Sequence, residues 1–365
     1  MKSSPWAVGA LALVFAFSPL VTEARIANKT VYPIVFAHGM AGFDNILGYD
    51  YWGDDYGYYV LDPAYNWDID WNQRSFVASV QPFHTSEQRG YQLYQDILGY
   101  MASTGATSVN IIGHSQGGLD LRKAAKSLYT AKGRQVVKYG ISISSPHRGS
   151  PIAKHVWRLG PGVQSVIETL AEFYGNVVYG AGNDAMAGLK QLIHDDIDPN
   201  DGQTTGTKVF NAANPASTTY IARPRSILTA QQGSSMNPAM YIVNEAFYDP
   251  DADGYATTDA DGDGALGIGN GNRRDTDDDG LVGLNSQQMG YRLQYYESWG
   301  ELDWIYERTD TGYVGDLNAP PSVAMTSKNW VVNQDHLDVV GVPPDTFDEM
   351  EFYAAITDYI ADGGY

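Results

Sequence analysis

The segment 108–132 constrains the fold more than any other part of the chain. An apolar run typical of a buried strand, SVNIIG, leads directly into Gly113-His114-Ser115-Gln116-Gly117, and a helical pattern follows over 116–132. In this strand–turn–helix arrangement the pattern G-x-S-x-G places a serine on a tight turn, with glycines where side chains would clash. The N-terminus of the helix directs backbone N–H groups and its positive dipole end at that serine. Ser115 is therefore the candidate nucleophile.

Strand and helix patterns alternate on either side of this turn. Apolar runs over 31–37, 108–113 and 136–145 are typical of buried strands, and 85–101 and 116–132 have helical periodicity. Such alternation predicts a mainly parallel α/β sheet with helices on both faces. Since no linker divides the chain, we expect one domain over residues 25–365.

A serine hydroxyl needs a base and an orienting acid, which follow it in the chain order serine, acid, histidine. Of the seven histidines, two precede Ser115 well upstream, His114 adjoins it, and three follow too closely to leave room for the acid. His336 remains as the candidate base. The spacing alone leaves Asp277, Asp278 and Asp279 open as the acid, because all three end an acidic loop just before the apolar segment LVG.

Several motifs resemble one protein family. They are YPIVFAHGMAGFDNILGYDYW (32–52), TSEQRGYQL (85–93), VNIIGHSQGG (109–118), SSPHRGS (144–150), FNA (210–212), DDGLVG (278–283) and NQDHLD (333–338). Together they resemble the calcium-containing bacterial triacylglycerol lipases, which are secreted α/β-hydrolases often matured by a foldase chaperone. The resemblance is nearly continuous over the first third of the chain and occurs in islands after that.

The resemblance implies a function and assigns roles to residues. It implies hydrolysis of long-chain triacylglycerols, with Ser115 as nucleophile, Asp279 as acid and His336 as base. It also implies an oxyanion hole made by the backbone N–H groups of Met40 and Gln116, and a foldase as a partner. The family often has a disulfide, which this cysteine-free chain lacks.

Calcium is the expected cofactor. The resemblance implies one structural Ca²⁺ held by Asp249, Asp338 and a backbone carbonyl, for which Val342 is the best candidate. Two runs of the form D-x-D-x-D-G resemble the opening of a calcium loop, although neither has an acidic residue at the twelfth position. Their alternative interpretation is a solvated acidic loop. The further candidate ligands in these runs are Asp251, Asp253, Asp259, Asp261 and Asp263.

Composition narrows the function classes. The net charge of −20 argues against a nucleic-acid-binding protein, and the absence of cysteine excludes a zinc–thiolate site and a cysteine nucleophile. Residues 1–24 have a basic start, an apolar run and a small residue at 24, which predicts a signal peptide and secretion through the periplasm without a membrane anchor. An uncleaved anchor is the alternative interpretation of that segment.

Two further segments stand out. An amphipathic stretch over 161–192 is a candidate lid over an apolar groove that opens at an oil–water interface, with a plain packed helix as the alternative. Residues 291–329 match nothing in the family pattern. Two other functions are weighed beside the lipase: a carboxylesterase for shorter or polymeric esters, and a non-catalytic calcium-dependent surface or adhesion protein.

Overall fold

The computed structural model describes residues 26–42, 45–46, 49–52, 66–150, 152–153, 162, 182–193, 206–231, 235–238, 240–241, 278–298, 302–319, 331–342 and 347–365. The predicted signal peptide lies outside the described residues, as do most of the candidate lid and Asp249, Asp251, Asp253, Asp259, Asp261 and Asp263. No helix in the described part of the chain is long and apolar enough to cross a membrane.

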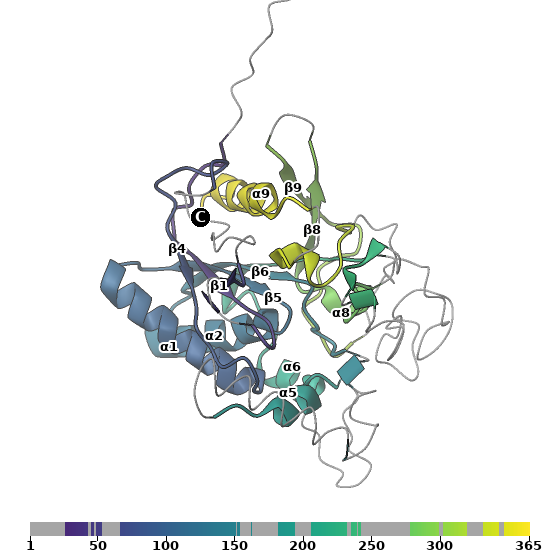
Figure 1. Ribbon diagram of the computed structural model, residues 1–365. Coiled ribbons are helices and arrows are strands. Elements are labelled where there is room, and N and C mark those ends of the chain that lie inside the picture. Colours follow the sequence, from purple (N-terminus) through teal and green to yellow (C-terminus); the bar gives the residue numbers. More distant parts are fainter. Residues whose placement is uncertain are drawn as a thin grey trace, which may run out of the picture.

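A seven-stranded sheet forms the centre of the protein (Figure 1). Its strand order is β4-β1-β5-β6-β7-β8-β9, and every neighbouring pair is parallel except β8 with β9. The strands are β1 (Ile34–Ala37), β4 (Ser75–Val77), β5 (Val109–His114), β6 (Val137–Ile143), β7 (Ile221–Ile227), β8 (Tyr291–Tyr296) and β9 (Trp304–Arg308). Two short antiparallel strands, β2 (Asn45–Ile46) and β3 (Tyr49–Asp50), form a separate ribbon.

Helices cover both faces of the sheet. The long helices α1 (Ser86–Thr104) and α2 (Gly117–Lys132) pack together on one face, and α9 (Glu349–Asp362) covers the other. The shorter helices are α5 (Ala185–Gln191), α6 (Thr207–Ala213), α8 (Leu284–Gln287) and the 3-10 turn η3 (Asp338–Val340). The prediction of a mainly parallel α/β sheet with helices on both faces is therefore confirmed.

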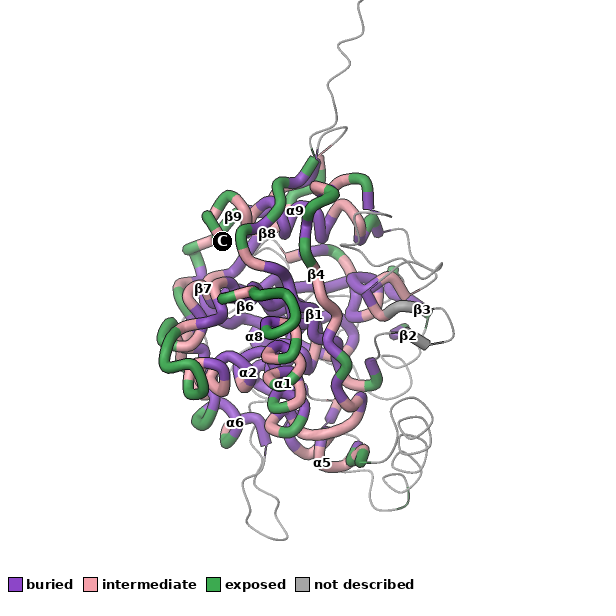
Figure 2. The backbone as a smooth tube through the Cα atoms, turned by 90° about the vertical axis from the view of Figure 1, so that its left-hand side faces the viewer, coloured by how far each residue is buried: buried purple, intermediate pink, exposed green. Residues whose placement is uncertain are grey.

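The core explains why the central strands are apolar throughout. In β1, Val35 and Ala37 join the cluster under α1 and α2, whereas Ile34 and Phe36 join the cluster under α9. Successive side chains of a strand point to opposite faces, so a strand covered on both sides must be apolar at every position. Figure 2 shows the result as a buried interior beneath a partly exposed outer layer of helices.

The observed elements agree closely with the predicted ranges. The helix predicted over 85–101 is α1, which begins after Thr85, whose side chain accepts a hydrogen bond from the Gln88 N–H. It ends at Gly105, which has a φ of 72°. A polar N-cap and a left-handed glycine are common helix boundaries.

Residues of the unmatched segment 291–329 extend the sheet. β8 pairs in parallel with β7 and carries the antiparallel edge strand β9, with Arg292 opposite Arg308. After β9 the chain returns to the start of β8, where Val314 pairs with Gly290. The described part of this segment is therefore framework of the central sheet.

Candidate active site

Ser115 lies between the end of β5 and the start of α2 and has a φ of 54°. A non-glycine residue in this left-handed region is strained, and such strain is typical of a nucleophile held on a sharp turn. The turn leaves no room for side chains at the flanking glycines. A Cβ on Gly113 would lie 2.5 Å from the Gly117 oxygen, and a Cβ on Gly117 would lie 2.1 Å from the Ala37 oxygen.

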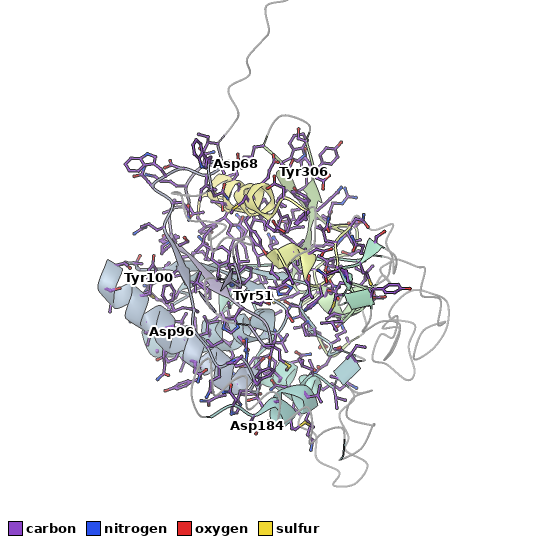
Figure 3. The ribbon with its side chains drawn as sticks, viewed as in Figure 1. Tyr51, Asp68, Asp96, Tyr100, Asp184 and Tyr306 are labelled. Carbon is purple, nitrogen blue, oxygen red and sulfur yellow. The ribbon has the colours of Figure 1, made fainter. Side chains whose placement is uncertain are left out.

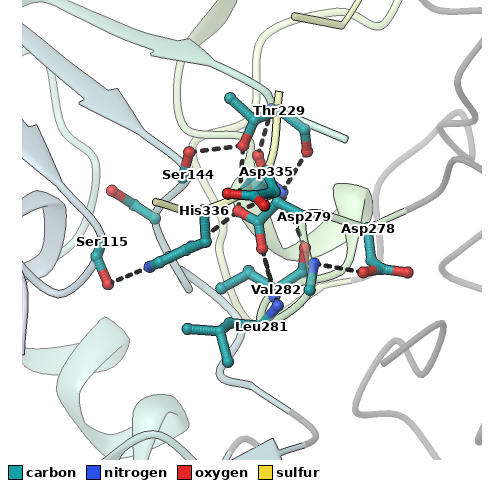
Figure 4. A network of polar contacts seen from close by, with 12 residues as sticks. Ser115, Ser144, Thr229, Asp278, Asp279, Leu281, Val282, Asp335 and His336 are labelled. Atoms are coloured by element: carbon teal, nitrogen blue, oxygen red, sulfur yellow. Dashed lines mark hydrogen bonds and ion pairs between the residues drawn. The ribbon is translucent and has the colours of Figure 1, made fainter. Parts of the chain in front are cut away.

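The structure brings Ser115, His336 and Asp279 into one hydrogen-bonded series (Figure 4). His336 Nε2 lies 2.9 Å from Ser115 Oγ, and His336 Nδ1 lies 2.9 Å from Asp279 Oδ2. Both His336 and Asp279 are buried, so water does not screen their interaction. This arrangement can transfer the serine proton to the imidazole and hold the imidazolium against a carboxylate.

The surroundings of Asp279 explain why it, and not its neighbour, faces the histidine. Its Oδ1 accepts hydrogen bonds from the N–H groups of Leu281 and Val282 at 3.1 and 2.8 Å, and its Oδ2 accepts from Thr229 Oγ1 at 3.1 Å. These donors fix the orientation of the carboxylate toward the histidine. Asp278 instead accepts from the Gly280 N–H, at the start of the same turn. Asp277, the third sequence candidate, lies outside the described residues.

A second carboxylate holds the turn that carries the histidine. Asp335 accepts from the N–H groups of Leu337 and Asp338 through Oδ1 and from the Asn237 N–H through Oδ2. The His336 N–H donates to the Asp279 carbonyl at 2.9 Å. Burial raises the pKa of Asp335 above its ordinary value, while these three N–H donors oppose that shift. The base is therefore fixed through both its backbone and its ring.

The predicted oxyanion donors lie beside the serine. In the described part of the chain neither the Met40 N–H nor the Gln116 N–H donates a hydrogen bond, so both are available to a ligand. Met40 and Ser115 line the same cavity, and Gln116 is the N-cap of α2. Free backbone N–H groups at a helix N-terminus suit a developing negative charge.

Arg89 from α1 clamps the loop that carries Met40. The guanidinium is fully buried; its Nη2 donates to the carbonyls of His38 and Gly39, and its Nη1 donates to those of Gln81 and Pro82. Its Nε donates to Asp120 on α2 at 2.8 Å. Burial, reinforced by the nearby guanidinium, lowers the pKa of His38 to about 3, so this histidine is neutral.

A cavity of about 560 Å³ opens beside Ser115 and His336. This volume lies within the range of about 300–1,000 Å³ that is usual for ligand pockets. Its walls are mostly apolar and come from the α5 region, the 146–153 segment and the turns that follow the acid and the base. The apolar lining residues are Met40, Ala41, Phe83, Pro146, Ile152, Ala153, Leu189, Leu192, Leu281, Val282, Leu337, Val340 and Val342.

The C-terminal end of the candidate lid belongs to this wall. α5 contributes Leu189, and its Gln191 accepts a hydrogen bond from the Ser86 N–H and contacts Glu87 at the start of α1. Gly182 accepts from Gln81, which anchors the entry to the same segment. The lid prediction for residues 163–181 lies outside the described residues.

The predicted calcium ligands are only partly described. Asp338 is buried in η3, and the Val342 carbonyl, on the same turn, accepts a hydrogen bond from Asn237 Nδ2 at 3.0 Å. Both present oxygen ligands, which suit Ca²⁺. Within the residues that the structure describes, no group of three or more histidine, aspartate or glutamate side chains is arranged to hold a metal ion.

Sequence reasoning missed the residues that support the site. Three of them are distant in sequence from the group that they hold: Arg89 is 51 positions from His38, Thr229 is 50 from Asp279, and Tyr51 is 12 from Gly39. The fourth, Asp335, adjoins His336 and accepts from the N–H group of Leu337. Only Asp335 had a usable signal, because Asp and Asn turns commonly accept from the backbone two residues on.

The sequence is similar over most of its length to proteins named triacylglycerol lipase. The protein of Burkholderia plantarii is 29% identical over 328 residues, which cover 81% of this chain and 85% of that protein. The protein of Pseudarthrobacter phenanthrenivorans is 28% identical over 307 residues, which cover 76% and 89%. A stretch of 127 residues is 37% identical to a triacylglycerol lipase of Vibrio cholerae and covers 34% of this chain. No protein-family model matches the sequence.

Solved structures show the same fold. The lipase of Staphylococcus hyicus superposes with a TM-score of 0.54 at 16% identity, covering 92% of this chain and 97% of that one. The metagenomic carboxyl esterase MGS0156 superposes with a TM-score of 0.51 at 12% identity, covering 91% and 76%. The chain therefore has the α/β-hydrolase fold, and its sequence relates it to bacterial lipases.

Proposed function

We propose that this chain is a secreted lipase that hydrolyses the ester bonds of long-chain triacylglycerols through an acyl-enzyme on Ser115. The observation that carries the proposal is the hydrogen-bonded series from Ser115 through His336 to the buried Asp279. It opens onto an apolar cavity with two free backbone N–H groups beside the serine. Such an arrangement combines a nucleophile, a base and an acyl-binding wall.

The chemistry follows from these positions. His336 Nε2 takes the proton of Ser115 Oγ as the oxygen attacks the ester carbonyl carbon. The carbonyl oxygen becomes an oxyanion that accepts from the N–H groups of Met40 and Gln116. His336 then protonates the departing alcohol, and Asp279 stabilises the imidazolium between these steps. Water, deprotonated by His336, releases the fatty acid and restores the serine.

The apolar wall favours a fatty acyl chain over a polar acid. Leu189, Leu192 and Ala153 line the cavity together with the turn that carries His336. Burying methylene groups there contributes about 0.8 kcal/mol for each. A non-catalytic adhesion protein would not require a buried hydrogen-bonded series of serine, histidine and aspartate, so the catalytic function is favoured.

Calcium belongs to the proposal as a structural ion. Asp338 and Val342 would be ligands together with Asp249, and the ion would stabilise the turn that follows His336. Asp251, Asp253, Asp259, Asp261 and Asp263 would hold further ions in the acidic segment. No step of the hydrolysis passes through the metal. Secretion through the periplasm and a foldase partner complete the proposal.

The test combines a nucleophile variant with a chain-length series. Ser115→Ala should lose more than about a thousandfold in kcat on p-nitrophenyl esters, and a phosphonate inhibitor should label Ser115 in the wild type only. Ala153→Leu should move the preferred acyl chain to shorter lengths, whereas Ala102→Leu, on the exposed side of α1, should leave it unchanged.

Activity on an emulsified triglyceride distinguishes the lipase from an esterase. A jump in rate as triolein passes its solubility limit supports the lipase. Full activity on short soluble esters with none on the emulsion would establish the carboxylesterase instead. Wild-type rates in Ser115→Ala would overturn the catalytic assignment altogether.

A further inference from the structure

Two polar side chains that line the cavity, the buried His114 and the half-buried Tyr51, take no part in the chemistry described above. Tyr51, which follows β3 and lies near the centre of the molecule in Figure 3, places its hydroxyl 3.0 Å from the Gly39 nitrogen and 2.5 Å from His114 Nδ1. The ring of His114 lies against the ring of His336, with centroids 4.7 Å apart and planes at 51°. Tyr51 therefore touches the loop of the oxyanion hole, and His114 touches the base.

One arrangement of the protons fits both distances. The Gly39 N–H is a donor only, so the Tyr51 oxygen accepts there. The tyrosine has one proton of its own, which it donates to His114 Nδ1. In this arrangement His114 is neutral, with its proton on Nε2. Burial lowers the pKa of His114 well below its ordinary value, which agrees with a neutral ring.

The loop that Tyr51 contacts is tightly packed against the nucleophile. A Cβ on Gly39 would lie 2.7 Å from Ser115 Cβ and 2.8 Å from the Tyr51 hydroxyl. Gly39 thus packs directly between the tyrosine and the serine. Because Met40 follows Gly39, the contact that fixes the Gly39 N–H restrains the loop that carries the Met40 N–H.

We propose that Tyr51 and His114 are positioning residues that join the oxyanion loop to the catalytic base. The inference rests on the proposed function. Tyr51 holds Gly39, and so the Met40 donor, against Ser115. His114 backs the His336 ring with an uncharged surface, so that the imidazolium formed during the reaction meets no like charge.

Tyr51→Phe tests the loop contact, because it keeps the aromatic packing and removes only the hydroxyl. We expect kcat to fall about 10- to 30-fold, since small misplacements of a catalytic donor have effects of this order. KM should stay within about twofold because the apolar wall is unchanged. Tyr139→Phe is the matched control: its buried ring packs on Tyr359 and Tyr365, away from the cavity, and kcat should be unchanged.

A pair of substitutions at His114 tests the contact between Tyr51 and His114 independently of Tyr51→Phe. Asparagine can accept from Tyr51 through its side-chain oxygen, so His114→Asn should keep most of the wild-type kcat. His114→Phe keeps a ring but no acceptor and should lose about as much as Tyr51→Phe. The double variant Tyr51→Phe/His114→Phe should be no slower than the slower single variant, because both break one contact.

Two measurements distinguish a variant that is destabilised from one whose catalytic groups are misplaced. Melting temperatures are measured for every variant, and kcat is taken on active sites titrated with the phosphonate. The acid limb of kcat/KM should report one ionisation in both wild type and His114→Asn. A second ionisation that disappears in His114→Asn would show a charged His114 and overturn the inference, as would wild-type kcat in Tyr51→Phe and His114→Phe. If Ser115→Ala stays active, the proposed function fails instead.

Discussion

Replacing Arg89 should separate its two roles, as the partner of Asp120 and as the clamp of the oxyanion loop. The guanidinium is 0% exposed and donates to Asp120 and to four backbone carbonyls, two of them from His38 and Gly39. Arg89→Met leaves the Asp120 carboxylate buried without its partner. Breaking a buried ion pair in this way costs about 3–5 kcal/mol of unfolding free energy. The unfolding free energy of a domain is typically about 5–15 kcal/mol, so a loss of this size should lower the melting temperature substantially.

The pH dependence of the single variant follows from Asp120. Burial raises the pKa of Asp120 to about 6 from 3.8, and the Arg89 charge opposes that shift. Without Arg89 the pKa rises further. A folded carboxyl that binds its proton more tightly than the unfolded one loses stability as the pH rises through its folded pKa. Arg89→Met should therefore be closest to the wild type in acid and furthest from it above neutrality.

The double variant Arg89→Met/Asp120→Asn removes the unpaired charge. It should recover a substantial part of the lost unfolding free energy and flatten the pH dependence. Its kcat should stay about 10- to 100-fold below wild type, as in the single variant, because the carbonyls of His38 and Gly39 still lack their donor.

Urea unfolding and p-nitrophenyl octanoate hydrolysis measure the two effects separately. Arg134→Met, at an exposed position after α2, is the control and should match the wild type in both assays. If the double variant regains wild-type kcat together with its stability, Arg89 only neutralises Asp120, and the clamp is refuted.

Three further predictions concern the acid, the surface charge and the metal. Asp279→Asn should lower kcat about 10⁴-fold by favouring the wrong tautomer of His336, whereas Asp278→Asn should leave kcat within a few-fold; equal losses in steady-state assays would contradict the choice of Asp279. Burial and the charges of Asp303, Asp348 and Asp68 raise the pKa of Glu351 to about 7 from 4.5. Because the folded carboxyl holds its proton more tightly than the unfolded one, the melting temperature should fall as the pH rises from 4.5 to about 7. Glu351→Gln should make this dependence of melting temperature on pH less steep. Parallel melting-temperature curves for the wild type and the variant would exclude Glu351 as the cause. Excess EDTA should lower the melting temperature, and Ca²⁺ but not Mg²⁺ should restore it; an unchanged melting curve would remove calcium from the proposal.

Local sequence patterns were sufficient to predict much of the fold. β5, the serine turn and α2 were predictable because each is specified within about 25 consecutive residues, by apolar runs and by glycines that only a tight turn requires. β7 and α9 went unpredicted. β7 contains Arg223, Pro224 and Arg225, whose polarity obscures a strand that nonetheless lies in the middle of the sheet.

The sequence decided that a serine would stand on a strained turn with His336 as the available base, because chain order and motif spacing are properties of the chain itself. It left Asp277, Asp278 and Asp279 equivalent. Tertiary structure directs Asp279 toward His336, since Thr229 and the N–H groups of Leu281 and Val282 donate to its carboxylate. The clamp of Arg89 and the contact of Tyr51 with His114 likewise exist only after folding. Each depends on where a distant backbone group points, and no pattern of neighbouring residues encodes that direction.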